Sequence, residues 1–401
     1  MPTTLIPLTQ GVPVSLASEL RKRLFYVSDE IGDFKLVERD GSIQAVEVSW
    51  AAGESSRAAS PEDVRRLEQN INDLVRNHIL SQKIFPPKEV WRAAPARTFQ
   101  QKTFDRLVRE GIAFEAGEGQ VGFGEPLISL MDYFDRRIKS VAMNLPNAKE
   151  YLYPTLLPTR VLEQCDYFNS FPQFVMFVTR LHNDMDVYRA FMKEYEGNPQ
   201  ITSGVFAHCR NHDYCLPPTM CYHSYHQHRG RQLEGDIVVT ARGKSFRFES
   251  RYSSGLERLW DFTIREIVFM GRQEFVLECR QHFMRQAFSL MDELGLSGSC
   301  EVANDPFFVN TDTAGKIGSQ RMMELKYELN LNVGPDDAIA VGSFNYHGNF
   351  FGQNFRITRE TGKPVATGCV GFGLERLVYA FLCQHGLDSN EWPQAVRSAL
   401  G

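Results

Sequence analysis

The sequence lacks the features of a membrane protein, an exported protein or a non-specific nucleic-acid binder. No apolar run approaches the roughly 20 residues that a bilayer-spanning helix needs. The N-terminal stretch MPTTLIPLTQGVPVS has neither the basic start nor the apolar middle of a signal peptide. The formal net charge is -5 and no long basic run occurs, which gives no support for strong attraction to phosphate backbones or anionic lipid. We therefore expect a cytoplasmic protein without membrane contact.

Cysteine is also scarce, although its distribution is uneven. Eight cysteines in 401 residues are too few for a disulfide scaffold, and without an export signal we expect reduced thiols. Three of them share the stretch AHCRNHDYCLPPTMCYHSYHQHRG, residues 207–230, with five histidines. These cysteines, Cys209, Cys215 and Cys221, are six residues apart, so the CxxC pair typical of a zinc finger does not occur.

The first 95 residues have the pattern of a small α+β domain, for which the sequence indicates no role. DFKLVERDGSIQAVEVSW predicts two strands joined at the Asp40-Gly41 turn. Ser60 is expected to cap a helix that begins at Pro61, since apolar residues then recur at helical spacing. Because Pro86-Pro87 stops the chain soon afterwards, we place a domain boundary near residue 95.

Residues 96–401 have the pattern of one continuous domain. Helices are expected over 126–144, 173–195 and 272–294. Strand-like runs cover 246–249, 262–269, 325–331, 339–346 and 365–370. Helices and strands do not alternate regularly, which favours an α+β fold with a mostly antiparallel sheet.

Two stretches of this domain have the pattern of a ligand site. In VATGCVGFGLERLVYAFLCQHG, a strand runs through Gly371 and Gly373 into a helix that carries Arg376 in its first turn. Glycine permits close backbone approach, and a helix N-terminus with an arginine suits a phosphate or an aromatic base. A simple strand-to-helix turn is the alternative interpretation.

The second stretch, KSFRFESRYSSGLERLWDFTIREIVFMG, predicts a hairpin. Arg247 and Glu249 are two residues apart and therefore share one face of its first strand. Such a pair is costly in a core unless it serves a ligand, whereas an exposed polar hairpin face would need no ligand.

Together the two stretches resemble motifs two and three of class II aminoacyl-tRNA synthetases. The resemblance implies that Arg247 grips the α-phosphate of ATP, that Phe262 stacks on adenine and that Arg376 covers the other side of the nucleotide. AKEYLYPTLLPTRVL resembles motif one, with Pro154 at the matching proline, and implies a homodimer.

Five further segments narrow the resemblance: LYPTLLPTRVLEQCDYFNSFPQF, CEVANDPFF, LKYEL, SFNYHGNFFGQNFRI and CVGFGLERL. In this order they resemble the seryl-tRNA-synthetase-like amino acid:[carrier protein] ligases over residues 100–401. The family implies a class II antiparallel sheet flanked by helices, and a zinc ion held by Cys221, Glu249 and Cys369. Three protein ligands leave the fourth tetrahedral position open, where a substrate amine fits. Cys209 and Cys215 are then expected to be small buried apolar groups, and His223, His226 and His228 to be structural or surface residues.

Weaker candidates lie near these motifs. Asn345 is a candidate for binding the substrate, although a polar residue at a strand end is an equal alternative. Lys326 and Glu328 share a strand face and are expected to form a cross-strand salt bridge. Ile339 stands where seryl-tRNA synthetases carry an acidic magnesium ligand, so the resemblance leaves the Mg²⁺ ligand unassigned.

The resemblance therefore implies a ligase that uses ATP, Mg²⁺ and Zn²⁺. It would activate a small amino acid, glycine or alanine, as aminoacyl-AMP and pass it to the phosphopantetheine thiol of a carrier protein. Two alternatives are a seryl-type tRNA synthetase and a non-catalytic amino-acid sensor. We expect tRNA not to be a partner, because the N-terminal region predicts one helix of about 20 residues rather than two long antiparallel ones.

Overall fold

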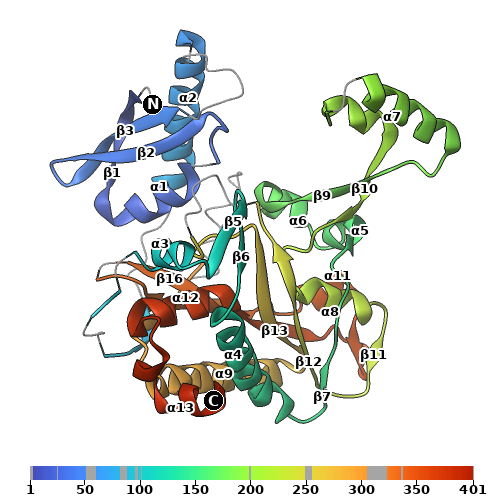
Figure 1. The fold of residues 1–401 in the computed structure, drawn as a ribbon. Coiled ribbons are helices and arrows are strands. Elements are labelled where there is room, and N and C mark those ends of the chain that lie inside the picture. Colours follow the sequence, from blue (N-terminus) through green and yellow to red (C-terminus); the bar gives the residue numbers. More distant parts are fainter. Residues whose placement is uncertain are drawn as a thin grey trace.

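The computed structural model describes residues 3–24, 26–50, 60–81, 88–94, 98–100, 102–197, 200–248, 255–304, 323–335 and 337–400. They form a small N-terminal unit, a large sheet with helices on both faces, and an arm that projects away from the sheet (Figure 1). In this described part of the chain, no helix is long and apolar enough to cross a membrane.

The N-terminal unit is a three-stranded antiparallel sheet with two helices against it. Strands β1 (Thr3–Pro13), β3 (Ser42–Trp50) and β2 (Ile31–Arg39) lie in that order, with α1 (Ala17–Leu24) and α2 (Pro61–Leu74). The hairpin predicted between β2 and β3 is confirmed: Asp40 and Gly41 both have positive φ, 50° and 74°, as a tight two-residue turn requires.

Helix α2 begins where the sequence predicts. Ser60 accepts from the Asp63 backbone N–H at 3.2 Å, and the Asp63 carboxylate accepts from the Ser60 N–H at 3.0 Å. This capping box satisfies two backbone donors that would otherwise lack partners at the helix start. Leu67 and Ile71 on the inner face of α2 are buried against the β1–β3–β2 sheet.

The large sheet has eight strands in the order β4-β14-β15-β16-β18-β13-β12-β7. All neighbouring pairs are antiparallel except β12 and β7, which are parallel. Its strands are β4 (Glu89–Arg92), β7 (Ala148–Glu150), β12 (Ile237–Phe246), β13 (Asp261–Gly271), β14 (Gly298–Val302), β15 (Lys326–Asn332), β16 (Ala338–Tyr346) and β18 (Ala366–Gly373). Strand β4 already belongs to this sheet, although it precedes the boundary expected near residue 95.

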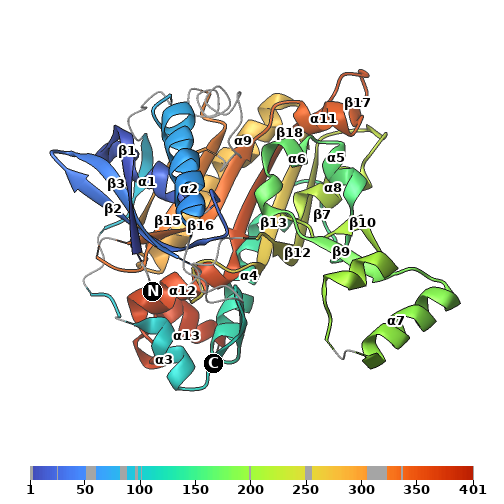
Figure 2. The same cartoon turned by 90° about the horizontal axis from the view of Figure 1, so that it is seen from above.

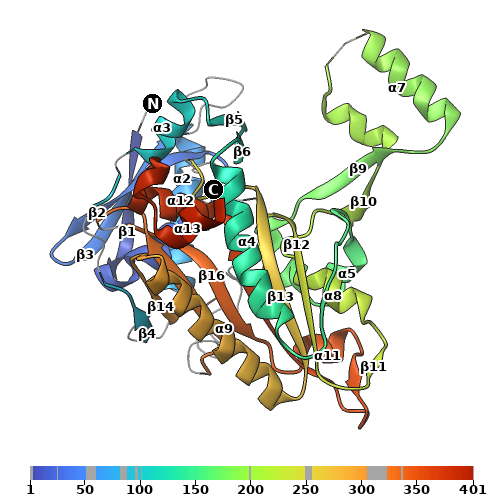
Figure 3. The same cartoon turned by 60° about the horizontal axis from the view of Figure 1, so that its bottom comes forward.

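The two faces of the sheet are covered by different helices. Helices α4 (Leu127–Met143), α9 (Gln273–Glu293), α12 (Leu374–His385) and α13 (Gln394–Leu400) pack on one face and enclose the larger apolar core (Figure 3). Helices α5 (Thr159–Glu163), α8 (Cys221–Gln227) and α11 (Phe350–Asn354) line the other face. The helices predicted over 126–144 and 272–294 are confirmed as α4 and α9, and the expected α+β class with a mostly antiparallel sheet is confirmed.

The helix predicted over 173–195 is wrong, because this segment forms part of the arm. The chain makes a short turn at Pro172–Phe174, then β9 (Phe177–Leu181), and only then helix α7 (Met185–Gly197). Strand β10 (Cys209–Cys215) returns beside β9 and also pairs with β8 (Leu157–Pro158). The Asp184 carboxylate accepts from the N–H groups of Asp186 and Val187, which starts the helix there. Helix α7 lies at the tip, away from the body (Figure 2).

Shorter elements complete the described part of the chain. They are η1 (Val14–Leu16), η2 (Val75–Ile79), α3 (Thr103–Arg109), β5 (Ala113–Gly117), β6 (Gln120–Phe123), α6 (Tyr167–Ser170), η3 (Pro172–Phe174), η4 (Ser203–His208), β11 (Gln232–Leu233), β17 (Thr358–Arg359) and η5 (Ser389–Glu391).

A buried asparagine joins α2 to β1 and generates a stability prediction. Asn72 Oδ1 accepts from the Thr9 N–H at 2.7 Å, and Asn72 Nδ2 donates to the Pro7 carbonyl at 3.1 Å. Asn72→Ala leaves both groups without this partner, so the free energy of unfolding of the N-terminal unit should fall by about 1–3 kcal/mol. Chemical denaturation measures the change. Asn77→Ala, at an exposed position of the same helical segment, is the control and should have little effect.

Candidate active site

A cavity of about 550 Å³ opens on the face of the large sheet that carries α8 and α11. Most of the residues selected from the sequence line it, although they come from segments far apart in the chain. They are Cys221, Arg247, Phe262, Asn345, Cys369, Gly371, Gly373 and Arg376. Glu249 lies outside the described residues.

At the floor of the cavity, two thiols meet a carboxylate. Cys221 begins α8, Cys369 lies on β18 and Glu266 on β13, and their nearest ligand atoms all lie within 4.8 Å of one another. All three side chains are buried. Two thiolates and a carboxylate are a donor set suited to Zn²⁺, with a fourth position left for another ligand.

The Glu266 carboxylate is held in a fixed orientation. The Thr219 hydroxyl donates to Glu266 Oε2 at 2.5 Å, and the Cys221 backbone N–H donates to the same oxygen at 2.9 Å. Hydrogen bonds of this kind orient metal-ligating carboxylates in many sites. The segment that supplies Cys221 therefore also orients the Glu266 carboxylate.

The electrostatics of the cluster favour a cation. Burial, the neighbouring Cys369 and the charge of Glu266 raise the pKa of the Cys221 thiol well above its usual value. Three acidic groups cannot all ionise at such short range without a compensating positive charge. A divalent cation would supply that charge, so the residues present fit a metal centre.

Glu266 is a candidate metal ligand that the sequence interpretation did not select. The resemblance led to Glu249, which belongs to the Arg-x-Glu pair, whereas the carboxylate beside the thiols comes from the strand after the loop. A signal did exist: in FTIREIVFM, Glu266 stands among β-branched and aromatic residues of a buried strand, where an unpaired carboxylate is costly.

Asn345 and His347 stand beside the Cys369 thiol. Asn345 Nδ2 lies 3.5 Å from Cys369 Sγ and 3.2 Å from Ser343 Oγ. His347 Nε2 lies 3.9 Å from the same sulfur, and His347 Nδ1 lies 3.4 Å from the Tyr225 hydroxyl. These groups form a polar wall on one side of the cluster, within reach of a small polar ligand.

Arg247 and Phe262 lie together at another part of the cavity. Arg247 follows the end of β12, and its Nε donates to the Pro218 carbonyl at 3.0 Å. Its guanidinium carbon lies 5.6 Å from the centroid of the Phe262 ring, a cation–π distance. A planar cation and an aromatic ring are thus presented side by side, as a nucleotide's phosphate and base require.

Gly371, Gly373 and Arg376 form the strand-to-helix junction that the sequence predicts. Gly371 pairs with Ser343 on one side and with Glu266 on the other. Helix α12 begins directly after Gly373. Arg376 Nε donates to the Glu257 carbonyl at 2.6 Å, which fixes the guanidinium at the cavity wall.

The remaining candidates fall into two groups. Lys326 and Glu328 line the cavity and form a salt bridge at 2.9 Å within β15, so the expected cross-strand bridge is wrong. Ile339 packs against the larger core and offers no metal-binding group.

The other cysteines and histidines of residues 207–230 lie apart from the thiol pair. Cys215 is buried in the arm sheet, where burial raises its pKa to about 11. His223 is buried and stacks on Tyr153 with ring centroids 5.3 Å apart. His228 Nδ1 lies 2.9 Å from the Ser224 carbonyl oxygen.

Comparison with known sequences gives two kinds of relative, while no protein-family model matches. The type-2 serine–tRNA ligase of Methanococcus aeolicus is 30% identical over 298 residues, 71% of this chain and 56% of its own length. Amino acid–[acyl-carrier-protein] ligase 1 of Bradyrhizobium diazoefficiens is 32% identical over 257 residues, 62% of this chain and 75% of its own length. The chain thus spans little more than half of the tRNA ligase.

Solved structures with the same fold include seryl-tRNA synthetases. M. kandleri SerRS, solved in complex with A. aeolicus tRNASec, superposes with a TM-score of 0.71 at 22% identity, over 99% of this chain and 77% of that one. The cytoplasmic serine–tRNA ligase of Naegleria fowleri, solved with AMP, gives 0.61 at 10% identity, over 85% and 71%. The expected class II synthetase-like fold is confirmed.

The junction at Gly371 provides a test of the cavity. A Cβ on Gly371 would lie 2.9 Å from Ile264 Cδ1 and 3.9 Å from Glu266 Oε1, so the methyl groups of Gly371→Val would occupy the cavity floor. Nucleotide binding, measured by calorimetry, should weaken ~10-fold or more, since small misplacements in a site are costly. Gly235→Ala is the control, because Gly235 lies outside the cavity and a Cβ there meets nothing within 4 Å. Equal nucleotide affinity in both variants would contradict this assignment of the cavity.

Proposed function

The chain belongs to the family of seryl-tRNA-synthetase-like class II ligases, and on this premise we propose that it activates a small amino acid with ATP and transfers it to a carrier-protein thiol. The proposed amino acid is glycine or alanine, and the proposed acceptor is a phosphopantetheine arm. The observation that carries the proposal is the cavity itself. It combines two arginines and an aromatic ring with a buried Cys–Glu–Cys cluster.

In the first proposed step, the carboxylate of the amino acid attacks the α-phosphate of ATP. A P–O bond to the substrate forms, the bond to pyrophosphate breaks, and the products are aminoacyl-AMP and pyrophosphate. Arg247 and Arg376 face this reaction as cations that balance the charge developing on the phosphates. Both are oriented by backbone carbonyls, so little reorganisation is needed when substrate binds.

We propose Cys221, Glu266 and Cys369 as the residues that hold Zn²⁺, with Glu266 replacing Glu249 as the third ligand. When bound, the ion would offer an open position to the neutral α-amine and so select free amino acids. Asn345 and His347 limit the room beside the Cys369 thiol, which favours a small side chain. Mg²⁺ is proposed to accompany ATP, as in aminoacyl ligases generally.

In the second proposed step, a thiolate attacks the carbonyl carbon of the aminoacyl-AMP. A thioester bond forms, and AMP leaves with the electron pair of the mixed anhydride bond. The carrier-protein acceptor is favoured because the carrier-protein ligase of B. diazoefficiens is matched over 75% of its length, against 56% for the M. aeolicus tRNA ligase.

A seryl-type tRNA ligase is the second candidate function. The M. kandleri SerRS complex contains tRNA and its fold covers 99% of this chain, the N-terminal unit included. The expectation that tRNA is not a partner rested on the lack of two long N-terminal helices. A SerRS that binds tRNA thus matches this chain over nearly its whole length, so the lack of two long N-terminal helices gives no ground for excluding tRNA.

We propose that two copies of the chain form a homodimer in which the segment around Pro154 makes the subunit contact. Leu152 and Leu156, on either side of this proline, are 90% and 42% exposed. Covering these two side chains in a subunit contact would remove apolar surface from water, which supports the proposal.

The proposed activity is tested by pyrophosphate exchange into ATP, screened over twenty amino acids. We expect exchange with glycine or alanine, followed by labelling of a holo carrier protein and not of its apo form, which lacks the thiol arm. Charging of tRNA with serine, without labelling of any holo carrier, would assign the chain to the second candidate. Absence of exchange with every amino acid, in zinc-loaded protein, would favour a non-catalytic sensor.

The metal assignment has a separate test. Purified protein should contain about one zinc per chain, and Cys221→Ser, Glu266→Gln and Cys369→Ser should each lose it. Metal analysis by plasma mass spectrometry gives the stoichiometry. Cys209→Ser in the arm and Glu249→Ala are matched controls that should retain zinc. Loss of zinc in Glu249→Ala, with retention in Glu266→Gln, would restore Glu249 as the ligand.

A further inference from the structure

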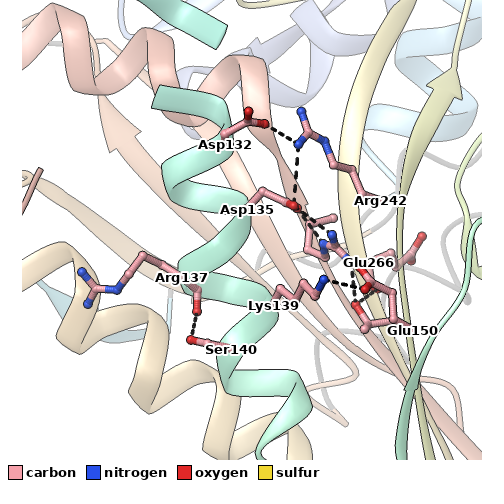
Figure 4. A network of polar contacts seen from close by, with 10 residues as sticks. Asp132, Asp135, Arg137, Lys139, Ser140, Glu150, Arg242 and Glu266 are labelled. Carbon is pink, nitrogen blue, oxygen red and sulfur yellow. Dashed lines mark hydrogen bonds and ion pairs between the residues drawn. The ribbon is translucent and has the colours of Figure 1, made fainter. Parts of the chain in front are cut away.

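Strand β13 places a buried arginine directly behind the proposed metal ligand. Consecutive strand residues point to opposite faces, so Glu266 lines the cavity while Arg265 bonds to Asp135 on helix α4. Figure 4 shows Asp132 and Asp135 on α4, beside the strands that carry Arg242 and Glu266. Arg265 is only 2% exposed and is among the largest fully buried side chains of the described residues. An arginine in such a position needs a full set of partners to offset the loss of water.

The partners of Arg265 come from three different elements. Arg265 Nε and Nη2 donate to the two carboxylate oxygens of Asp135 on α4, at 2.6 and 2.9 Å. Arg265 Nη1 donates to Glu150 Oε1 on β7 at 3.0 Å and to Thr240 Oγ1 on β12 at 3.3 Å. The bidentate geometry with Asp135 fixes the guanidinium in one orientation.

Thr240 connects this cluster to the backbone of the metal ligand. Its hydroxyl donates to the Glu266 carbonyl oxygen at 2.9 Å and accepts from Arg265. Thr240 is completely buried, so no water competes for these bonds. Thr219 and Cys221 thus orient the Glu266 carboxylate on the cavity side. Thr240 holds the Glu266 main chain on the helix side.

The outer members of the network keep it electrically balanced. Arg242 pairs with Asp132 at 2.6 Å and lies 3.7 Å from Asp135, while Lys139 pairs with Glu150. Three cations and three carboxylates therefore share the interface between α4, β7, β12 and β13. Removing one member would leave its partner charged and without compensation.

We infer that Thr240 and Arg265 are positioning residues that hold Glu266 in place as a metal ligand and make its position depend on α4 and β7. This inference rests on the proposed metal centre. Helix α4 and strand β7 directly precede the segment proposed as the subunit interface. A shift of either element would reach Glu266 through Asp135, Glu150 and Thr240. A purely structural network would stabilise the fold without affecting the ion.

The test is the affinity for metal in the absence of any substrate. The full-length chain is titrated with Zn²⁺ against a chelator, and with Co²⁺, whose thiolate absorption reports the ligand set. Thr240→Val removes the hydroxyl and keeps the shape of the side chain. We expect about 10- to 100-fold weaker Zn²⁺ binding, the usual effect of losing an outer-shell partner.

Ser245→Ala is the matched control on the same strand. Ser245 is also completely buried, but its hydroxyl has no hydrogen-bond partner among the residues described, so its loss should leave metal affinity unchanged. Arg265→Lys keeps the charge but loses the bidentate bond to Asp135, and should also weaken Zn²⁺ binding. In pyrophosphate exchange, Thr240→Val should raise the amino acid KM and leave the ATP KM unchanged.

The outcomes separate the inference from the proposed function. A Thr240→Val variant that binds Zn²⁺ with wild-type affinity overturns the inference, even if its melting temperature falls. A wild-type protein that binds neither Zn²⁺ nor Co²⁺ overturns the metal centre and the inference together. Weakened binding in both Thr240→Val and Ser245→Ala would show a general effect of buried hydroxyls and also overturns it.

Discussion

The register of β13 between β12 and β18 is the constraint on which the site depends. In this register Glu266 faces Gly371, and Val268 faces Cys369, so carboxylate and thiol emerge on the same face of the sheet. A slip of one residue would turn the Glu266 carboxylate into the apolar core and Arg265 into the cavity. The buried cluster around Arg265 opposes such a slip, since the guanidinium finds its carboxylate partners only behind the sheet. The alternation of side chains along β13 therefore decides both how this strand pairs and which groups face the cavity.

The sequence predicts the local elements of this fold well and the assembled site only in part. Asp40-Gly41 and Ser60-Pro61 act through neighbouring backbone groups, so their turn and helix start follow from short-range physics. The sequence predicts a helix instead of the arm strand because the apolar residues of this segment recur at helical spacing. The competing signal, Asp184 at the true helix start, is a single residue. Pairing of β9 with β10 across the arm decides the structure of this segment, and no local pattern encodes such a partner.

Glu266 shows the same limit at the site. Motif resemblance selects residues by spacing along the chain, whereas the carboxylate beside the thiols is decided by which strand lies next to β18. In the sequence, Glu249 and Glu266 stand on the two strand-like runs of one predicted hairpin. Cross-strand pairing brings Glu266 within 4.8 Å of both sulfurs, whereas Glu249 lies outside the described residues.

The distance along the chain between Cys221, Glu266 and Cys369 gives the centre a particular place in folding. In a zinc finger, neighbouring ligands bind an ion and thereby fold a short loop. Here the candidate ligands come from α8, β13 and β18, so sheet formation would meet the entropy cost of closing the loops between them before an ion binds. An ion bound at this position would consequently reach the chain late, when the central strands have already paired. A bound ion would therefore be found on chains whose sheet is complete, and loss of the ion would leave the sheet folded.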